Sequence, residues 1–250
     1  HQSGSRSFFQ DSRVQGLRRP GGTAASVVWV DTGGRCSRRA PGQVSGITKS
    51  GYERVEIVIA TRNKRKLEEM RRIGRGWAIA FLSLDDFPDC PPVEEDGETF
   101  EANAAKKALS VSAWTGKRAV ADDSGLEVDA LGGAPGVRSA RYAWPHSGDR
   151  ENLEKLLNEL RSVEGERRGA RFVSCVALAA PGGNVKTFRG TVRGRIGTEP
   201  RGESGFGYDP VFYPEGHLRT FAEMEDAEKD AISHRGRALR ELGRHLSAGG

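Results

Sequence analysis

The chain has 250 residues, a formal net charge of +5 and only 36% hydrophobic residues. None of its apolar runs approaches the roughly 20 residues that a membrane-spanning helix needs, which excludes an integral membrane protein and a membrane partner. The three cysteines, Cys36, Cys90 and Cys175, are too far apart for a disulfide framework or a CxxC metal site, so a reducing, cytoplasmic location is expected.

The positive charge is concentrated in the N-terminal fifth of the chain. Residues 1–52 contain eight of the 39 Lys and Arg residues but only two of the 34 Asp and Glu residues, so the remainder is close to neutral. A near-neutral body lacks the basic footprint of nucleic-acid-binding proteins, and no nucleic-acid partner is expected. Because residues 1–52 are also polar and without sustained periodicity, we expect a poorly ordered or non-native extension there.

Residues 53–250 show the pattern of a single α/β domain with a mixed sheet and flanking helices. A β-branched run at 56–60, a polar turn and an apolar helical period at 64–73 predict a strand–turn–helix unit. Alternating segments at 170–180 and 184–196 are joined by Pro181-Gly182-Gly183, which predicts an antiparallel hairpin. The other predicted elements are strands at 78–84, 119–121, 126–131 and 211–213, helices at 98–115 and 152–160, and one or two helices over 223–246.

The turn after the first predicted strand has the character of a phosphate site. A strand–turn–helix junction presents free backbone N–H groups and the positive end of a helix dipole. Thr61 and Asn63 add short polar groups, and Lys66 adds a positive charge one turn into the helix. It is not a P-loop, because GxxxxGK[ST] occurs nowhere in the chain. Taken alone, a capped helix with a solvated basic face explains the same residues.

Two groups of acidic residues are candidate metal ligands. Asp122 and Asp123 end an apolar strand, where ligands of open α/β sheets bind, and adjacent carboxylates repel unless a cation compensates. Such acids hold Mg²⁺ or deprotonate a water molecule. The run Glu94-Glu95-Asp96 precedes the long predicted helix. A solvated turn is the competing interpretation, which we favour for the second group alone but not for the first.

Three further features could bind an anion or a flat ligand. Lys107 lies near the small-residue face of the predicted helix 98–115, where it could bind an anion or simply extend to solvent. The loop 205–210 places two aromatic residues between glycines, which suits either ring stacking or a hydrophobic plug. His234 and Arg235 are hydrogen-bond donors near a predicted helix start, although such a pair is usually a surface feature.

Together these pieces form an ordered set of motifs from about Val55 to Leu246. In chain order the motifs are Thr61-x-Asn63-x-x-Lys66, Phe100-x-x-Asn103-Ala104-x-x-Lys107-Ala108, Asp122-Asp123-Ser124-Gly125-Leu126, Gly132-Gly133-Ala134-Pro135-Gly136-Val137-x-Ser139-Ala140-Arg141-Tyr142, Phe206-Gly207-Tyr208-Asp209-Pro210 and Ser233-His234-Arg235-Gly236. On these motifs the chain resembles the inosine triphosphate pyrophosphatases, also called non-canonical purine NTP pyrophosphatases. It departs from the family at Ala102, where Glu is usual.

The resemblance implies an α/β fold with two lobes around a central substrate cleft, a homodimer, and residues 53–250 as the nucleoside triphosphate pyrophosphatase domain. The implied reaction is Mg²⁺-dependent hydrolysis of ITP, dITP and XTP to the monophosphate and pyrophosphate, which removes them from the nucleotide pool. Asp123 is implied as the general base, with Glu95, Asp122 and Asp123 as Mg²⁺ ligands. The implied contacts to the purine nucleoside triphosphate are Thr61, Asn63, Lys66, Lys107, Ser124, Phe206, Tyr208, Asp209, Lys229, His234 and Arg235.

Two other functions remain as alternatives on the sequence. A Maf-type nucleotide pyrophosphatase would have a related architecture and act on other nucleotides, but the motifs at 206–209 and 234–235 argue against it. A nucleotide- or RNA-binding module without catalysis is disfavoured by the near-neutral body and by the Asp122-Asp123 pair. A comparison of ITP, dTTP and ATP as substrates would separate all three.

Overall fold

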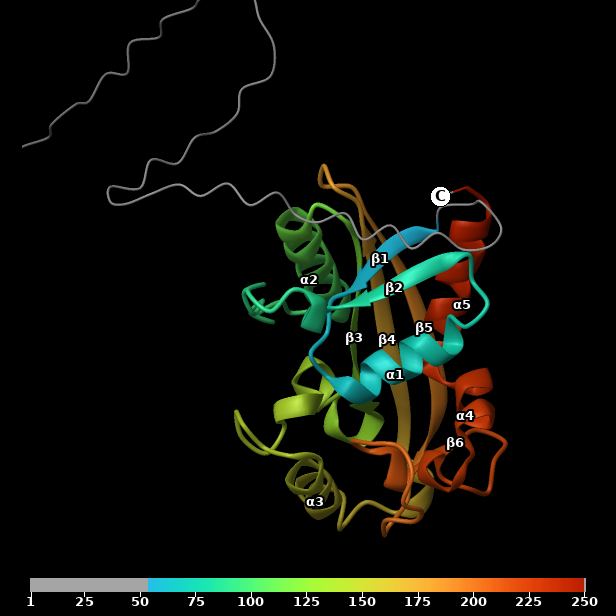
Figure 1. Ribbon diagram of the computed structural model, residues 1–250. Coiled ribbons are helices and arrows are strands. Elements are labelled where there is room, and N and C mark those ends of the chain that lie inside the picture. Colours follow the sequence, from blue (N-terminus) through green and yellow to red (C-terminus); the bar gives the residue numbers. More distant parts are fainter. Residues whose placement is uncertain (1–53, 250) are drawn as a thin grey trace, which may run out of the picture. The chain divides into compact units, whose positions relative to one another are not determined.

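The computed structural model describes residues 54–249 (Figure 1). Contacts divide the chain into the units His1–Gly46 and Ile47–Gly250, and only the second contains described residues. Residues 1–52, for which a poorly ordered or non-native extension was predicted, therefore lie outside the described part, and so does Cys36. Among the described helices, none combines the length and the apolar character needed to cross a membrane.

A six-stranded mixed sheet forms the centre of the described unit, in the order β2-β1-β3-β4-β5-β6. β1 pairs in parallel with β2 and β3, whereas β3 to β6 are joined by antiparallel pairing. The strands are β1 (Val55–Ile59), β2 (Ile79–Ser83), β3 (Arg118–Val128), β4 (Gly169–Ala179), β5 (Val185–Ile196) and β6 (Phe212–Pro214). The predicted hairpin is thus β4–β5.

Residues 54–249 contain five α-helices: α1 (Lys64–Ile73), α2 (Phe100–Thr115), α3 (Asp149–Glu159), α4 (Asp226–Ile232) and α5 (His234–Ser247). Successive strand residues point to opposite faces, so the sheet has two packing surfaces. On one face, α2 packs against alternate residues of the central strands, such as Ala121 and Cys175. On the other face, α1 and α5 pack against the intervening residues, such as Val120 and Val176.

A further apolar cluster fills the far ends of β3, β4 and β5, together with α3 and β6. Along this part of β3 the glycine-rich segment 132–141 takes the place of a neighbouring strand. The Val128 N–H donates to Ala134 O (3.1 Å), and the Leu126 N–H donates to Ser139 Oγ (2.9 Å). The predicted α/β class, with a mixed sheet and flanking helices, is confirmed. Asp122 and Asp123 lie in β3 between the apolar clusters of the two sheet faces.

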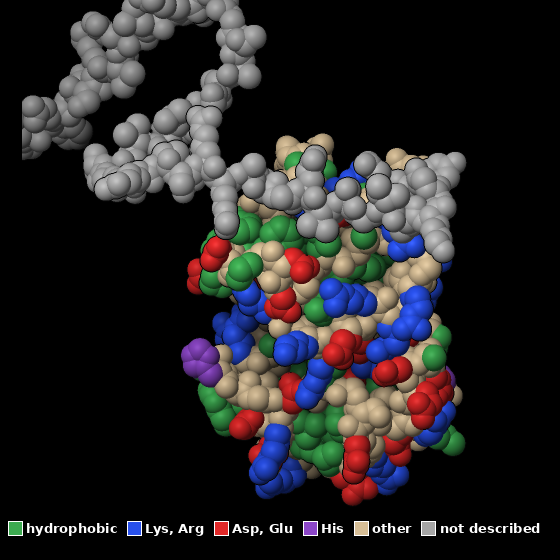
Figure 2. Space-filling view, viewed as in Figure 1, with side chains coloured by type: hydrophobic (Ala, Val, Ile, Leu, Met, Phe, Trp, Pro, Cys, Tyr) green, Lys and Arg blue, Asp and Glu red, His purple; other side chains and the backbone are tan. Residues whose placement is uncertain are grey.

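One detail differs from the sequence-based expectation. β3 runs without a break from Arg118 to Val128, so Asp122, Asp123 and Ser124 lie inside a strand and not in a loop at its end. The C-terminal segment, for which one or two helices were predicted, forms two, which are divided at Ser233; the Ser233 hydroxyl accepts from the Gly236 N–H and caps α5. The face shown in Figure 2 carries interleaved basic and acidic side chains, in keeping with the near-neutral composition of this part of the chain.

Candidate active site

The β1–α1 turn is organised by the polar residues predicted to contact phosphate. The Asn63 side chain accepts from the backbone N–H groups of Arg65 (3.0 Å) and Lys66 (3.2 Å), which caps α1. The Thr61 hydroxyl accepts from the Asn63 N–H (3.1 Å). Lys66 extends from the first turn of the helix to Asp122, with 2.9 Å between Nζ and Oδ2. The turn therefore combines an oriented helix start with a cation at the centre of the sheet.

Asp122 and Asp123 point to opposite faces of β3, because adjacent strand residues alternate. Asp122 faces α1 and α5, is fully buried, and pairs with Lys66 and with Arg235 (3.0 Å). The hydroxyls of Ser174 (2.6 Å) and Ser124 (2.9 Å) donate to the same carboxylate. Burial favours the protonated acid, but Arg235 and Lys66 hold the pKa of Asp122 well below its usual range. Asp122 is thus a permanently charged anchor.

Asp123 faces α2 and has a different environment. Its Oδ2 accepts from the Asn103 amide (3.0 Å), and its Oδ1 lies 3.8 Å from Lys107 Nζ. Burial raises the pKa of Asp123 to about 6, with Lys107 and Lys66 opposing the rise and Glu95 adding to it. A carboxylate with a pKa near the operating pH is suited to accept a proton from water.

Glu95 reaches the same place from the loop before α2. Its carboxylate lies 3.2 Å from Lys107 Nζ, and although burial acts the other way, Lys107 lowers the pKa of Glu95. Arg141 holds the loop by donating to Glu95 O (3.0 Å). Asn103 also holds it, because its amide oxygen accepts from the Gly97 N–H (2.8 Å). Asn103 therefore connects Asp123 with the loop that carries Glu95.

The carboxylates of Glu95 and Asp123 fit a hard cation such as Mg²⁺, which prefers oxygen ligands and usually keeps several waters. Within residues 54–249, no group of three or more His, Cys, Asp and Glu side chains is arranged to hold a metal. Asp122, the third residue expected to bind the metal, lies on the opposite face of β3 from Asp123 and pairs with Lys66 and Arg235. Water and phosphate oxygens would have to supply the remaining ligands.

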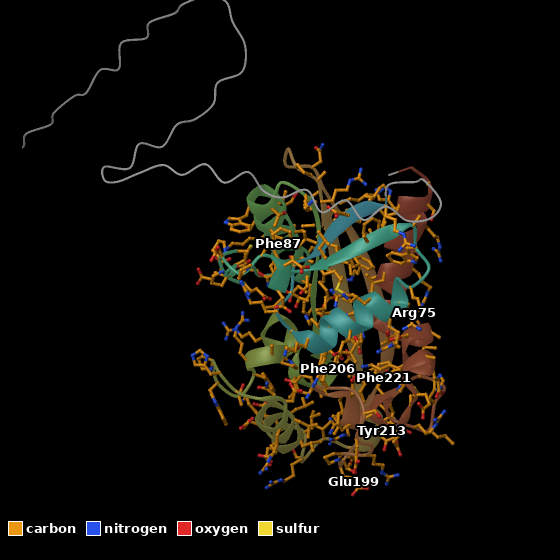
Figure 3. All side chains as sticks on the ribbon, in the orientation of Figure 1. Arg75, Phe87, Glu199, Phe206, Tyr213 and Phe221 are labelled. Atoms are coloured by element: carbon orange, nitrogen blue, oxygen red, sulfur yellow. The ribbon has the colours of Figure 1, made fainter. Side chains whose placement is uncertain are left out.

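The loop 205–209 is tied to a buried ionic cluster. Asp209 Oδ2 accepts from the Phe206 N–H (2.9 Å) and from Lys229 Nζ (2.7 Å). Lys229 and Arg235 both bind Glu69 of α1. The Phe206 ring lies beside these cations, 5.1 Å from Lys229 Nζ and 5.6 Å from Arg235 Cζ, and Figure 3 shows it below α1.

Of the two aromatic residues in this loop, only Phe206 is available to stack on a ligand. Tyr208 is buried and its hydroxyl donates to Ser139 O (2.8 Å), so it secures the loop to the glycine-rich segment.

His234 and Arg235 lie at the start of α5 and are buried, not at the surface as isolated residues of these types usually are. The His234 ring stacks on Phe172 at 4.7 Å between centroids. Burial and the neighbouring Arg235 hold the pKa of His234 well below its usual range, so the imidazole is neutral. His234 Nδ1 and Arg235 Nε have no hydrogen-bond partner. Buried polar atoms without partners are rare and suggest that a ligand completes them.

Sequence reasoning missed several residues of this site. Glu69 is buried on α1 between two cations, and its position beside the apolar residues Leu67 and Met70 was the signal available. Ser174 interrupts an apolar strand and binds Asp122. Asn103 belongs to one of the sequence motifs, but its bonds to Asp123 and Gly97 become visible only in the structure.

The sequence profile of the Ham1 family matches residues 57–245. The chain belongs to the Ham1 family. A relative from Geobacter sulfurreducens, named dITP/XTP pyrophosphatase, is 53% identical over 190 residues, which cover 76% of this chain and 96% of the relative. A protein of the same name from Mycobacterium tuberculosis is 51% identical over 187 residues, covering 74% of this chain and 91% of the relative.

Solved structures of Ham1 proteins agree with the fold. The HAM1 protein from Coxiella burnetii has a TM-score of 0.72 and 43% identity, and the match covers 78% of this chain and 99% of that one. The dITP/XTP pyrophosphatase from Mycobacterium abscessus has a TM-score of 0.62 and 48% identity, covering 75% and 98% of the two chains.

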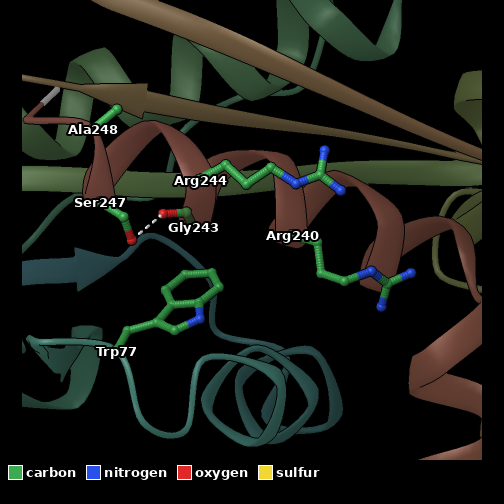
Figure 4. A pocket seen from close by; sticks show the side chains of 6 residues that line it. All are labelled: Trp77, Arg240, Gly243, Arg244, Ser247 and Ala248. Atoms are coloured by element: carbon green, nitrogen blue, oxygen red, sulfur yellow. Dashed lines mark hydrogen bonds between the residues drawn. The ribbon is translucent and has the colours of Figure 1, made fainter.

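A hollow of about 550 Å³ lies apart from the predicted site residues (Figure 4). It is formed between Trp77 and the C-terminal half of α5, and Trp77 packs so closely on Gly243 that a Cβ there would lie 2.8 Å from the indole. None of the residues predicted to bind substrate or metal lines it.

Proposed function

We propose that this protein hydrolyses the non-canonical purine nucleoside triphosphates ITP, dITP and XTP to the monophosphate and pyrophosphate. The observation that carries the proposal is the environment of Asp123. It is a buried carboxylate with a pKa of about 6, oriented by Asn103 and placed beside Lys107 and Glu95. At neutral pH it is mostly ionised and can take the proton of a water that attacks the α-phosphate.

The triphosphate would bind where positive charge and oriented donors converge. Lys66 and Lys107 offset its negative charge, and Thr61 and Asn63 organise the helix start beside it. Ser124 follows Asp123 in the chain, accepts from Arg235 through its hydroxyl, and would contact the substrate beside that side chain. Glu95 and Asp123 would hold Mg²⁺, which when bound supplies charge neutralisation at the phosphates. Asp122 would instead hold Lys66 on the triphosphate side of the site and Arg235 on the purine side, through its ion pairs with both.

The purine base would bind beside Phe206, Asp209, Lys229, His234 and Arg235, with Tyr208 supporting the loop. Hypoxanthine and xanthine carry an oxygen at C6, where adenine carries an amino donor. Arg235 retains an unpaired Nε–H that suits this oxygen, and the neutral His234 would donate to it in the tautomer that carries its proton on the unpaired Nδ1. With adenine, a buried donor would face another donor, which costs the desolvation energy of both groups.

The names of the relatives support this substrate class. We further propose a homodimer working in the cytoplasm, as the family resemblance implies, on a nucleotide pool that the reaction keeps free of deaminated purines.

The test is phosphate release from ITP, XTP, ATP and dTTP, measured with and without added inorganic pyrophosphatase. We expect ITP and XTP to give phosphate only when the pyrophosphatase is present, ATP to react far more slowly, and EDTA to stop the reaction until Mg²⁺ is restored. Preference for dTTP would support a Maf-type enzyme instead. Binding of ITP without hydrolysis would support a binding module.

A further inference from the structure

Asp149, the first residue of α3, contacts two segments outside its own helix. Its Oδ2 accepts from Arg65 Nη1 of α1 (2.8 Å) and from the backbone N–H of Gly207 (3.0 Å). Nothing in the chemistry described above uses Asp149. A surface aspartate that binds only a surface arginine would be an ordinary ion pair of little energetic value. The second contact is different, because it fixes a main-chain group of the loop that carries Phe206.

The loop depends on this contact for part of its conformation. Gly207 has a φ of 62°, a left-handed conformation that glycine adopts readily. Asp209 holds the Phe206 N–H from inside the loop, whereas Asp149 holds the Gly207 N–H from α3. The two acids therefore fix successive peptide groups on either side of the Phe206 ring. Loss of one would release the peptide that follows the ring.

Arg65 joins the same arrangement to the phosphate side of the site. Its guanidinium carbon lies 5.9 Å from the centre of the Phe206 ring while its Nη1 binds Asp149. Arg65 precedes Lys66, which reaches Asp122 from the same helix turn. α1 and α3 belong to different apolar clusters, so the Arg65–Asp149 pair connects two parts of the molecule that are packed separately.

We infer that Asp149 is a positioning residue for nucleobase binding, which orients the Phe206 loop and couples it to the helix that carries the phosphate contacts. The inference rests on the proposed function for its substrate. It assigns Asp149 an effect on substrate affinity and not on the chemical step, because the residue contacts the Phe206 loop from α3 and its hydrogen bonds and ion pair go to Gly207 and Arg65, not to Asp123 or Glu95.

The test compares the full chain with Asp149→Ala, Asp149→Asn, Arg65→Gln and Glu151→Gln. Asp149→Ala should raise KM for ITP about threefold to tenfold, the range for one lost hydrogen bond, and change kcat less than about twofold. Asp149→Asn keeps an oxygen for the Gly207 N–H and should recover most of the affinity. Arg65→Gln should show the smaller effect of an exposed pair. Glu151 caps the same helix end through the Gly148 N–H without touching the loop, so Glu151→Gln should match the parent.

Hydrogen exchange of the Gly207 amide gives a readout that does not depend on catalysis. It should be faster in Asp149→Ala than in the parent, with Asp149→Asn between them. Unchanged exchange and unchanged KM in Asp149→Ala would overturn the inference, as would an equal rise of KM in Glu151→Gln. If the parent fails to hydrolyse ITP, the proposed function and the substrate assignment of Asp149 both fall, and the exchange result still decides whether Asp149 orients the loop.

Discussion

Replacing Glu69 by Gln tests whether the ionic cluster beneath the Phe206 loop contributes to the stability of the protein. Glu69 is 7% exposed and binds Lys229 (2.8 Å) and Arg235. Burial favours its protonated form, but Arg235 and Lys229 lower the pKa of Glu69 from 4.5 to about 2. At about 1.4 kcal/mol per unit, a carboxylate so depressed adds roughly 3 kcal/mol to the free energy of unfolding. Glu69→Gln should lose about this much.

The stabilisation by Glu69 should decrease as the pH falls. The folded-state pKa lies below the unfolded one, so the contribution of Glu69 is complete above about pH 4.5 and disappears as the pH falls toward 2. Urea unfolding of parent and variant, followed by circular dichroism, should therefore show a gap of about 3 kcal/mol at pH 7 that narrows progressively below pH 4.5.

Glu68→Gln is the matched control, since Glu68 is the exposed neighbour on the same helix. It should leave the free energy of unfolding within about 0.5 kcal/mol of the parent at every pH. Equal stability of Glu69→Gln and the parent at pH 7, or a gap that stays constant from pH 7 to pH 3, would refute the assignment of Glu69 as a buried counter-ion.

Two substitutions test the catalytic side of the site. Asp123→Asn should reduce kcat for ITP on the order of 10²–10⁴-fold, the contribution of general-base catalysis. Its melting temperature should stay equal to that of the parent or rise, because burial disfavours the native carboxylate. Turnover within threefold of the parent would exclude Asp123 as the base. Asn103→Ala removes the contacts to both Asp123 and Gly97 and should lower kcat/KM for ITP roughly tenfold or more. Parent-like kinetics of Asn103→Ala would show that Asp123 needs no partner to orient it.

Local patterns in the sequence predicted much of the fold. The strand–turn–helix at β1 and α1 and the β4–β5 hairpin depend on neighbouring residues, and the structure has both. The position of Lys66 one turn into α1 follows from the same local geometry.

Tertiary contacts explain what the sequence did not predict. Asp122, Asp123 and Ser124 are poor strand formers, and the expected end of the strand at residue 121 follows from that preference. In the structure Lys66 and Asn103 bind the two carboxylates from opposite faces, so the strand continues. Both partners are distant in sequence. The cations that bind Glu69, Lys229 and Arg235, are likewise distant in sequence, so the neighbouring apolar residues were the only local sign that Glu69 is buried.

Asp122 and Asp123 face opposite sides of the sheet, so the role of each acid depends on which face of β3 its position presents. The residue opposite Val176 becomes a fixed anion, and the residue opposite Cys175 becomes a candidate proton acceptor, although both are aspartate. Pairing with β4 runs from Ala119 to Val128 and fixes this orientation. A single inserted residue before Asp122 would exchange the two faces and bring the wrong carboxylate to Asn103 and Lys107. The register of the β3–β4 pair thus determines which of the two aspartates can do acid–base chemistry.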